Sequence, residues 1–124
     1  MTAFKRLVPV LPVRDVLAER EFYESLGFAR HVDPRESYPE SVFAAFTAGP
    51  NVQFGVAIDP GFDADTADSR LWWQIEVDDV QDLHELARRE KLEIEQAPRI
   101  ESWGRRTLKL RSPNGYVVTF EEVK

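Results

Sequence analysis

The apolar and polar positions of the chain follow the same order in its two halves. In the first half an apolar stretch at 6–13 precedes an amphipathic run at 16–27. In the second half an apolar stretch at 71–77 precedes an amphipathic run at 79–90. An aspartate suited to cap a helix opens each run, and apolar residues recur within both runs at helical spacing. Each half therefore predicts a strand followed by a helix. A repeat this long indicates two equivalent modules.

The remainder of each half predicts three further strands. Their expected ranges are, in the first half, 28–33, 41–48 and 51–58, and in the second half, 92–94, 106–110 and 116–122. Turn-forming residues mark the connections, with a hairpin turn at Gly49-Pro50, a loop at 33–39 and a turn at Ser112-Pro113-Asn114-Gly115. The predicted fold class is α+β, with two βαβββ modules.

The domain organisation follows from the length of the chain. We expect one domain over residues 1–124, with module one at about 1–58, an acidic linker at about 59–70 and module two at about 71–124. A module of this size cannot bury a core alone, so it must pack against a partner. The first strand is apolar on both faces, while Pro9 and Pro12 remove donors from its ladder. We expect it at a sheet edge or crossing between subunits.

Charge and composition narrow the class of protein. The formal net charge of −6 disfavours nucleic acid, which selects a clustered basic face, and it favours cationic small molecules, although the acids can also be plain surface charge. No apolar run approaches the roughly 20 residues that span a bilayer, and the Pro-interrupted apolar run after Lys5 and Arg6 leads us to expect no signal peptide. The absence of cysteine excludes disulfides and thiolate chemistry. We expect a cytoplasmic protein with no nucleic-acid or membrane partner.

Four segments together resemble one known family. They are Val8-Pro9-Val10-Leu11-Pro12-Val13-Arg14-Asp15, Phe22-Tyr23-Glu24-Ser25-Leu26-Gly27-Phe28, Val77-Asp78-Asp79-Val80 and Leu110-Arg111-Ser112-Pro113-Asn114-Gly115-Tyr116. Their order and spacing are similar to the vicinal oxygen chelate superfamily, which groups glyoxalases, extradiol dioxygenases and bleomycin-resistance proteins. Ser102-Trp103-Gly104-Arg105 looks most like the bleomycin-resistance branch. The resemblance implies a cupped mixed sheet around a cavity, helices on the outer face, and a homodimer with cavities at the subunit interface.

The resemblance also allows a test for a metal site. Superfamily enzymes hold a divalent cation with His, Gln or Glu on the first, fourth, fifth and eighth strands. The matching positions here are Val8, Gln53, Trp72 and Thr119. Valine and tryptophan supply no ligand atom to a hard cation, so we expect no metal and no other cofactor. His31 and His84 match no ligand position, and no catalytic constellation is visible.

The same register predicts which residues line the cavity. Strand alternation puts Trp72, Gln74 and Glu76 on one face, and the resemblance directs that face inward. Trp103 is expected as a wall or lid and Phe46 on the opposite wall, whereas Trp73 is expected in the core. The full expected ligand-binding set is Val8, Val10, Phe46, Gln53, Gly55, Trp72, Gln74, Glu76, Trp103, Thr119 and Glu121.

Three functions remain open at this point. The favoured hypothesis is a metal-independent protein that sequesters an aromatic, cationic natural product such as a bleomycin-type antibiotic, with indoles stacking on its rings and Glu76 and Glu121 meeting its charge. The alternative is a divergent enzyme of the superfamily acting on a small organic substrate. A structural dimer with a vestigial cleft is the third. Arg105 or Lys109 could also neutralise the two carboxylates, in which case their role is structural.

Overall fold

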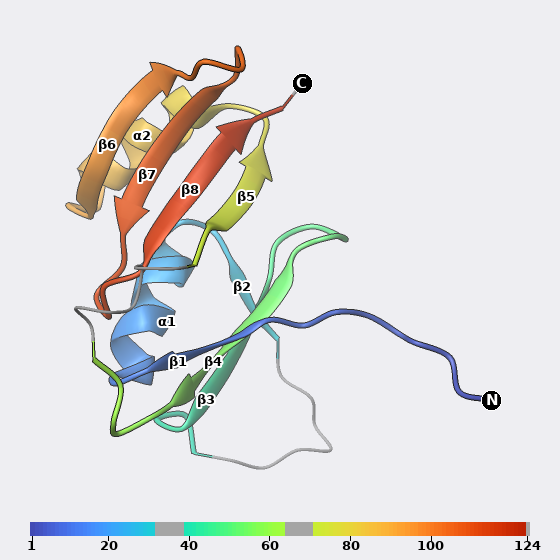
Figure 1. Cartoon of the computed structure of the whole chain (residues 1–124). Helices are drawn as coiled ribbons and strands as arrows, with labels where there is room; N and C mark the ends of the chain where they lie inside the picture. Colours follow the sequence, from blue (N-terminus) through green and yellow to red (C-terminus); the bar gives the residue numbers. More distant parts are fainter. Residues whose placement is uncertain (32–38, 64–70, 124) are drawn as a thin grey trace.

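The computed structural model describes residues 1–31, 39–63 and 71–123 of the chain (Figure 1). Its elements are, in order, β1 (Val10–Val13), α1 (Val16–Ser25), β2 (Ala29–His31), β3 (Phe43–Thr47), β4 (Gln53–Ile58), β5 (Trp73–Val77), α2 (Val80–Arg89), β6 (Glu93–Ile100), β7 (Arg106–Arg111) and β8 (Val117–Glu122). Most of the predicted loop at 33–39 and of the linker at 59–70 lies outside the described residues.

The strands form two four-stranded mixed sheets with the same topology. Their orders are β1-β4-β3-β2 and β5-β8-β7-β6. In each sheet the first strand pairs in parallel with the last strand of its module, and the other pairs are antiparallel. The predicted α+β class and the paired βαβββ modules are therefore confirmed, and β1 lies at a sheet edge as its prolines predict.

The two helices begin in the same way. Asp15 caps α1 by accepting a hydrogen bond from the Ala18 amide at 3.1 Å, and Asp79 caps α2 by accepting one from the Asp82 amide at 3.1 Å. α1 packs on β3 and β4, and α2 packs on β6, β7 and β8. Each sheet thus has one face covered by its helix and one open face. Neither helix, within the described residues, is long and apolar enough to cross a membrane.

The core of module one is an aromatic cluster around Tyr23, which is fully buried. The ring centroids of Phe28, Phe46 and Phe54 lie 5.5, 5.3 and 4.8 Å from that of Tyr23. Phe54 in turn meets Trp73 of module two edge to face at 5.1 Å. Because that contact joins the two modules, their cores form one continuous apolar cluster.

Two expectations about single strands are wrong. The first strand begins only at Val10, and its side chains alternate between exposed and buried rather than being buried on both faces. Residues 1–9 form no strand. The Pro9 carbonyl still accepts a hydrogen bond from the Gly55 amide of β4 at 2.9 Å, and the chain toward the N-terminus extends away from both sheets, with Phe4 almost completely exposed (Figure 1). The strand expected to begin at 92–94 is not short: it runs over Glu93–Ile100 and crosses Pro98, which an edge strand tolerates.

Candidate functional site

The open face of module two carries five of the expected site residues. Gln74 is the Cα partner of Thr119, and Glu76 is the partner of Glu121, so these four side chains share the face turned away from α2. Trp73 and Ile75 point to the other face, where their partners Val118 and Phe120 are buried. The alternation read from the sequence therefore has the correct register, and Trp73 joins the core cluster as expected.

Trp72 is a fixed aromatic surface at the edge of this open face. Its indole is 63% exposed, and its Nε1 donates a 2.7 Å hydrogen bond to Oε1 of Gln74. The ammonium of Lys109 lies 5.2 Å from the centroid of the ring, within cation–π range. Trp72, Lys109 and Thr119 line a shallow hollow of about 280 Å³ together with Leu71, Trp73, Glu95 and Val117.

Glu76 and Glu121 form a pair of carboxylates that shares one cation. Nη1 of Arg105 lies 3.0 Å from Oε1 of Glu121 and 3.5 Å from Oε2 of Glu76. The side chain of Glu121 is 8% exposed and that of Glu76 is 61% exposed. Arg105 therefore balances the buried carboxylate first, as one of the sequence hypotheses required. Glu76 keeps most of its surface free.

Trp103 stands on the turn between β6 and β7. Its indole is 53% exposed. Gly104, which follows it, has a φ of +91°, a conformation that glycine adopts without strain and that lets the chain turn sharply here. The Gly104 amide donates to the Glu101 carbonyl at 2.9 Å, and the Glu101 amide donates to the Arg105 carbonyl at 2.8 Å. The turn thus holds Trp103 and Arg105 at the same end of the open face.

The open face of module one carries a second group of expected residues. Val10 is the Cα partner of Gly55, and Gly55 is in turn the partner of Ala45. Gln53 shares this face by alternation with Gly55, and Val8 lies half-buried just before β1. This face is more apolar than that of module two.

The expected wall residue Phe46 is not on this face. It is fully buried on the helix side, packed against Tyr23 and Phe54, because its position in β3 has the opposite parity to Ala45. Phe43 takes the wall position instead. A Cβ on Gly55 would lie 2.9 Å from Cζ of Phe43, so the Phe43 ring covers Gly55 on the open face. Counting in steps of two from Ala45 would have identified Phe43 from the sequence.

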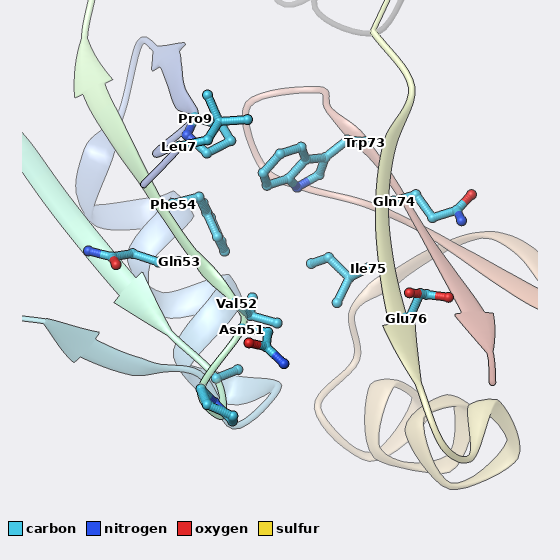
Figure 2. A pocket seen from close by; sticks show the side chains of 12 residues that line it. Leu7, Pro9, Asn51, Val52, Gln53, Phe54, Trp73, Gln74, Ile75 and Glu76 are labelled. Carbon is cyan, nitrogen blue, oxygen red and sulfur yellow. The ribbon is translucent and has the colours of Figure 1, made fainter. Parts of the chain in front are cut away.

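A cleft of about 580 Å³ separates β4 and its preceding turn from β5. In Figure 2, Phe54 and Val52 point into it from one side, and Trp73 and Ile75 point into it from the other. Leu7 and Pro9 close one end. Gln53 and Gln74 lie on its rims and point away from each other (Figure 2). The side chains that point into the cleft from its two walls are therefore apolar, while Asn51, Gln53, Gln74 and Glu76 add polar groups to its lining. Within the described residues the two open faces are not brought together.

A buried polar cluster lies behind the Trp73 wall of this cleft. Tyr23 Oη, Trp73 Nε1 and Glu19 Oε2 are buried side-chain atoms of this cluster. Burial raises the pKa of the Tyr23 hydroxyl well above 10, and the nearby Glu19 carboxylate raises it further. Burial also raises the pKa of Glu19. A hydrogen bond from the Trp73 side chain lowers the pKa of the Tyr23 hydroxyl, so α1 and the β5 wall of the cleft meet at this pair.

The superfamily follows from comparison of the whole chain with known proteins. The model of the Glyoxalase/Bleomycin resistance protein/Dioxygenase superfamily matches residues 5–120. The chain belongs to this superfamily. No curated protein matches its sequence.

Solved structures similar to this chain include both bleomycin-binding proteins and a possible glyoxalase. The bleomycin-binding protein of bleomycin-producing Streptomyces verticillus, complexed with copper(II)-bleomycin, is 25% identical, with a TM-score of 0.71 over 100% of both chains. Another bleomycin-binding protein, complexed with bleomycin, is 20% identical with a TM-score of 0.71, covering 98% of this chain and 100% of that one. A possible glyoxalase from Bacillus cereus is 15% identical with a TM-score of 0.71, covering 96% and 99%. The fold alone therefore does not choose between binding and catalysis.

The metal-ligand positions of superfamily enzymes do not fit a metal in this chain. Val8 and Trp72 lack suitable donor atoms, and the Trp72 nitrogen donates its proton to Gln74. Gln53 and Gln74 point to opposite sides of the cleft (Figure 2). In the parts of the chain that the structure describes, no three His, Cys, Asp or Glu side chains converge on one point. The donor set at these strands does not suit a hard divalent cation.

Proposed function

We propose that this chain is a metal-independent binding protein that sequesters an aromatic, cationic small molecule of the bleomycin type. The observation that carries the proposal is the open face of module two, which presents both an exposed, fixed indole and an exposed carboxylate. Trp72 is held by Gln74, so it offers a planar surface at little entropic cost. Glu76 lies on the same face four residues beyond Trp72, and its side chain is mostly exposed. Aromatic rings and a positive charge can be bound side by side there.

The comparisons support the chemical class of the ligand. Two of the similar solved structures are complexes with bleomycin, and the chain belongs to their superfamily. The net charge of −6 favours a cationic ligand over an anionic one. Glu121 contributes less than its sequence position suggested, because Arg105 already balances it. The ligand charge is therefore assigned to Glu76. A cytoplasmic location, where such a ligand would be met after entry, is part of the proposal.

A homodimer completes the proposed site. One chain leaves the apolar open face around Val10 and Gly55 separate from the face around Trp72 and Thr119. Two copies related by a twofold axis can bring module one of each chain opposite module two of the other. Large apolar side chains exposed in one chain support this arrangement, among them Phe4, Leu7, Val10, Trp72, Ile100 and Trp103. The extended residues 1–9 are long enough to contribute to exchange of the first strand.

The test is thermal melting of metal-stripped protein with divalent metals, bleomycin and other aromatic natural products as separate additions. A ligand that binds only the native state at 100 times its Kd stabilises by about 2.7 kcal/mol. We expect stabilisation by metal-free bleomycin-type compounds. Stabilisation by a divalent metal alone would instead support the divergent enzyme, and no stabilisation by any compound would reject sequestration. Sedimentation of the same sample measures the expected dimer.

A matched pair of variants locates the charge contact. Glu76→Gln should weaken a cationic ligand, whereas Glu85→Gln on the exposed side of α2 makes the same charge change away from the face. Equal effects of the two variants would mean that only net charge matters, and would remove Glu76 from the proposed site.

A further inference from the structure

The two features proposed to recognise a cationic aromatic ligand each hold a cation of the protein already. The Lys109 ammonium lies over the Trp72 ring, and the Arg105 guanidinium lies between the Glu76 and Glu121 carboxylates. Both cations come from the same module as the groups they contact. The two kinds of contact by which this face would bind a cationic ligand are therefore already made with cations of the same chain.

The Arg105 position is defined by strand register. Glu76 and Glu121 are Cα partners on the parallel strands β5 and β8, so their carboxylates lie side by side. Neighbouring carboxylates repel each other, and one guanidinium within 3.5 Å of both relieves that repulsion. The group as a whole keeps one negative charge, since two carboxylates face one arginine.

The Arg105 side chain can leave this position without unfolding the turn that carries it. The side chain is 49% exposed. The backbone of the turn is held separately, by the hydrogen bonds of Glu101 to Arg105 and of Gly104 to Glu101. The Glu101 carboxylate is fixed in turn by Thr107 at 2.7 Å and by Arg99 at 3.1 Å. Displacing the guanidinium therefore breaks ion pairs but no turn contact.

We propose that Arg105 is a specificity-determining residue of the proposed site, whose guanidinium occupies the cation position at Glu76 and Glu121 and must be displaced by a cationic ligand. This inference rests on the proposed function. While Arg105 stays in place, its like charge opposes the approach of a ligand cation to Glu76. A neutral aromatic ligand, which contacts Trp72 alone, meets no such opposition. Arg105 thus makes the face selective, because only a cation that binds the carboxylates strongly enough to displace the guanidinium can occupy this position.

The test compares benzamidine, a planar aromatic cation, with benzamide, its neutral analogue of the same shape. Each is titrated into the full chain by calorimetry. Arg105→Met should bind benzamidine roughly fivefold more tightly than the wild type, as expected for one partly exposed ion pair, with benzamide affinity unchanged. Arg106→Met is the matched control, because Arg106 is exposed on the opposite face of β7 and its loss changes the net charge equally. We expect no gain from that variant.

A second variant covers the case in which Arg105→Met folds poorly because Glu121 is left unbalanced. Arg105→Met combined with Glu121→Gln removes both charges, so it should melt near the wild type, and it should still bind benzamidine more tightly than Glu121→Gln alone, because no guanidinium opposes the approach to Glu76. Equal benzamidine affinity of these two variants would overturn the inference. Unchanged or weaker benzamidine binding by folded Arg105→Met, or an equal gain in Arg106→Met, would overturn the inference. Failure of the wild type to bind any bleomycin-type compound would reject the proposed function instead, whatever the benzamidine ratio shows.

Discussion

Glu19 of α1 accepts two hydrogen bonds from Asn114, a residue of the other module. The Asn114 amide and its Nδ2 donate to Oε1 of Glu19 at 2.8 and 3.1 Å. Asn114 Oδ1 also accepts from the amides of Arg14 and Asp15 at 2.9 Å each, and its Nδ2 donates to the Asp15 carbonyl at 2.8 Å. The β7–β8 turn of module two therefore caps the chain where it enters the helix of module one.

Asn114→Ala should destabilise the protein by roughly 3 kcal/mol, because it removes the Nδ2 hydrogen bond to the buried Glu19 carboxylate and takes the Oδ1 acceptor away from the amides of Arg14 and Asp15. Urea unfolding of the full chain measures this. Asn51→Ala is the matched control, since Asn51 lies in the exposed turn between β3 and β4 and should cost about 0.5 kcal/mol or less. Similar losses from both variants would show that the Asn114 contacts do not join the modules.

The contribution of Glu19 to the free energy of unfolding should fall as pH rises. Burial raises the pKa of Glu19 above its ordinary value of 4.5 and Asp15 adds to the rise, while hydrogen bonds from Ser112 and Asn114 oppose it. The folded chain then holds this proton more tightly than the unfolded chain. Stability from this group is present below pH 4.5 and is lost as pH rises through the folded pKa.

Glu19→Gln isolates that contribution. The glutamine carbonyl can accept the same two hydrogen bonds, and it does not ionise. The free energy of unfolding of Glu19→Gln relative to the wild type should therefore rise with pH above 4.5 and level off above the folded pKa. Taking the difference cancels the opposite contribution of Glu40, Glu95 and Glu101, whose pKa values arginines and hydrogen bonds lower. A difference that is flat with pH would mean that Glu19 titrates normally.

Alanine substitutions of Trp73 and Trp103 should differ in effect, the first lowering stability and the second weakening ligand binding. Trp73 is half-buried against Phe54, so Trp73→Ala should cost roughly 3 kcal/mol of stability. Trp103 is half-exposed on a turn that is held by its own backbone, so Trp103→Ala should change the melting temperature little and weaken an aromatic ligand. Melting and ligand titration of both variants give the comparison. Equal losses of stability would remove the assignment of Trp103 as a lid.

The sequence predicted the parts of the fold that local rules determine. Capping residues and helical spacing located α1 and α2, and alternation put Trp72, Gln74 and Glu76 on one face. Two errors came from strand parity and length. Phe46 is expected on the wall opposite Trp103, although its parity in β3 directs it into the core. The apolar residues and prolines within 6–13 predict a strand over the whole run, although β1 begins at Val10 and, just before it, the Pro9 carbonyl accepts a hydrogen bond from the Gly55 amide of β4 at 2.9 Å.

Contacts between the modules could not be read from the sequence. Asn114 looks like an ordinary turn residue beside Pro113 and Gly115, and Glu19 looks like one acid among several on an amphipathic helix. Only the packing of the two modules makes them partners 95 positions apart. The choice of Arg105 over Lys109 as the partner of Glu121 likewise depends on where the β6–β7 turn is directed.

The contact between Gly55 and Phe43 allows a test of the open face of module one. A Cβ at Gly55 would lie 2.9 and 3.2 Å from Cζ and Cε2 of Phe43, and 3.3 Å from the Ala44 carbonyl oxygen. Gly55→Ala should therefore cost roughly 1–2 kcal/mol, because the ring must move out of its position. In a Phe43→Leu background the same substitution should be close to neutral, since the ring is gone and alanine loses less backbone entropy on folding than glycine. Urea unfolding of the two single variants and the double variant completes the cycle. An equal cost of Gly55→Ala in both backgrounds would place the strain at the Ala44 carbonyl and would remove Phe43 from the wall of this face.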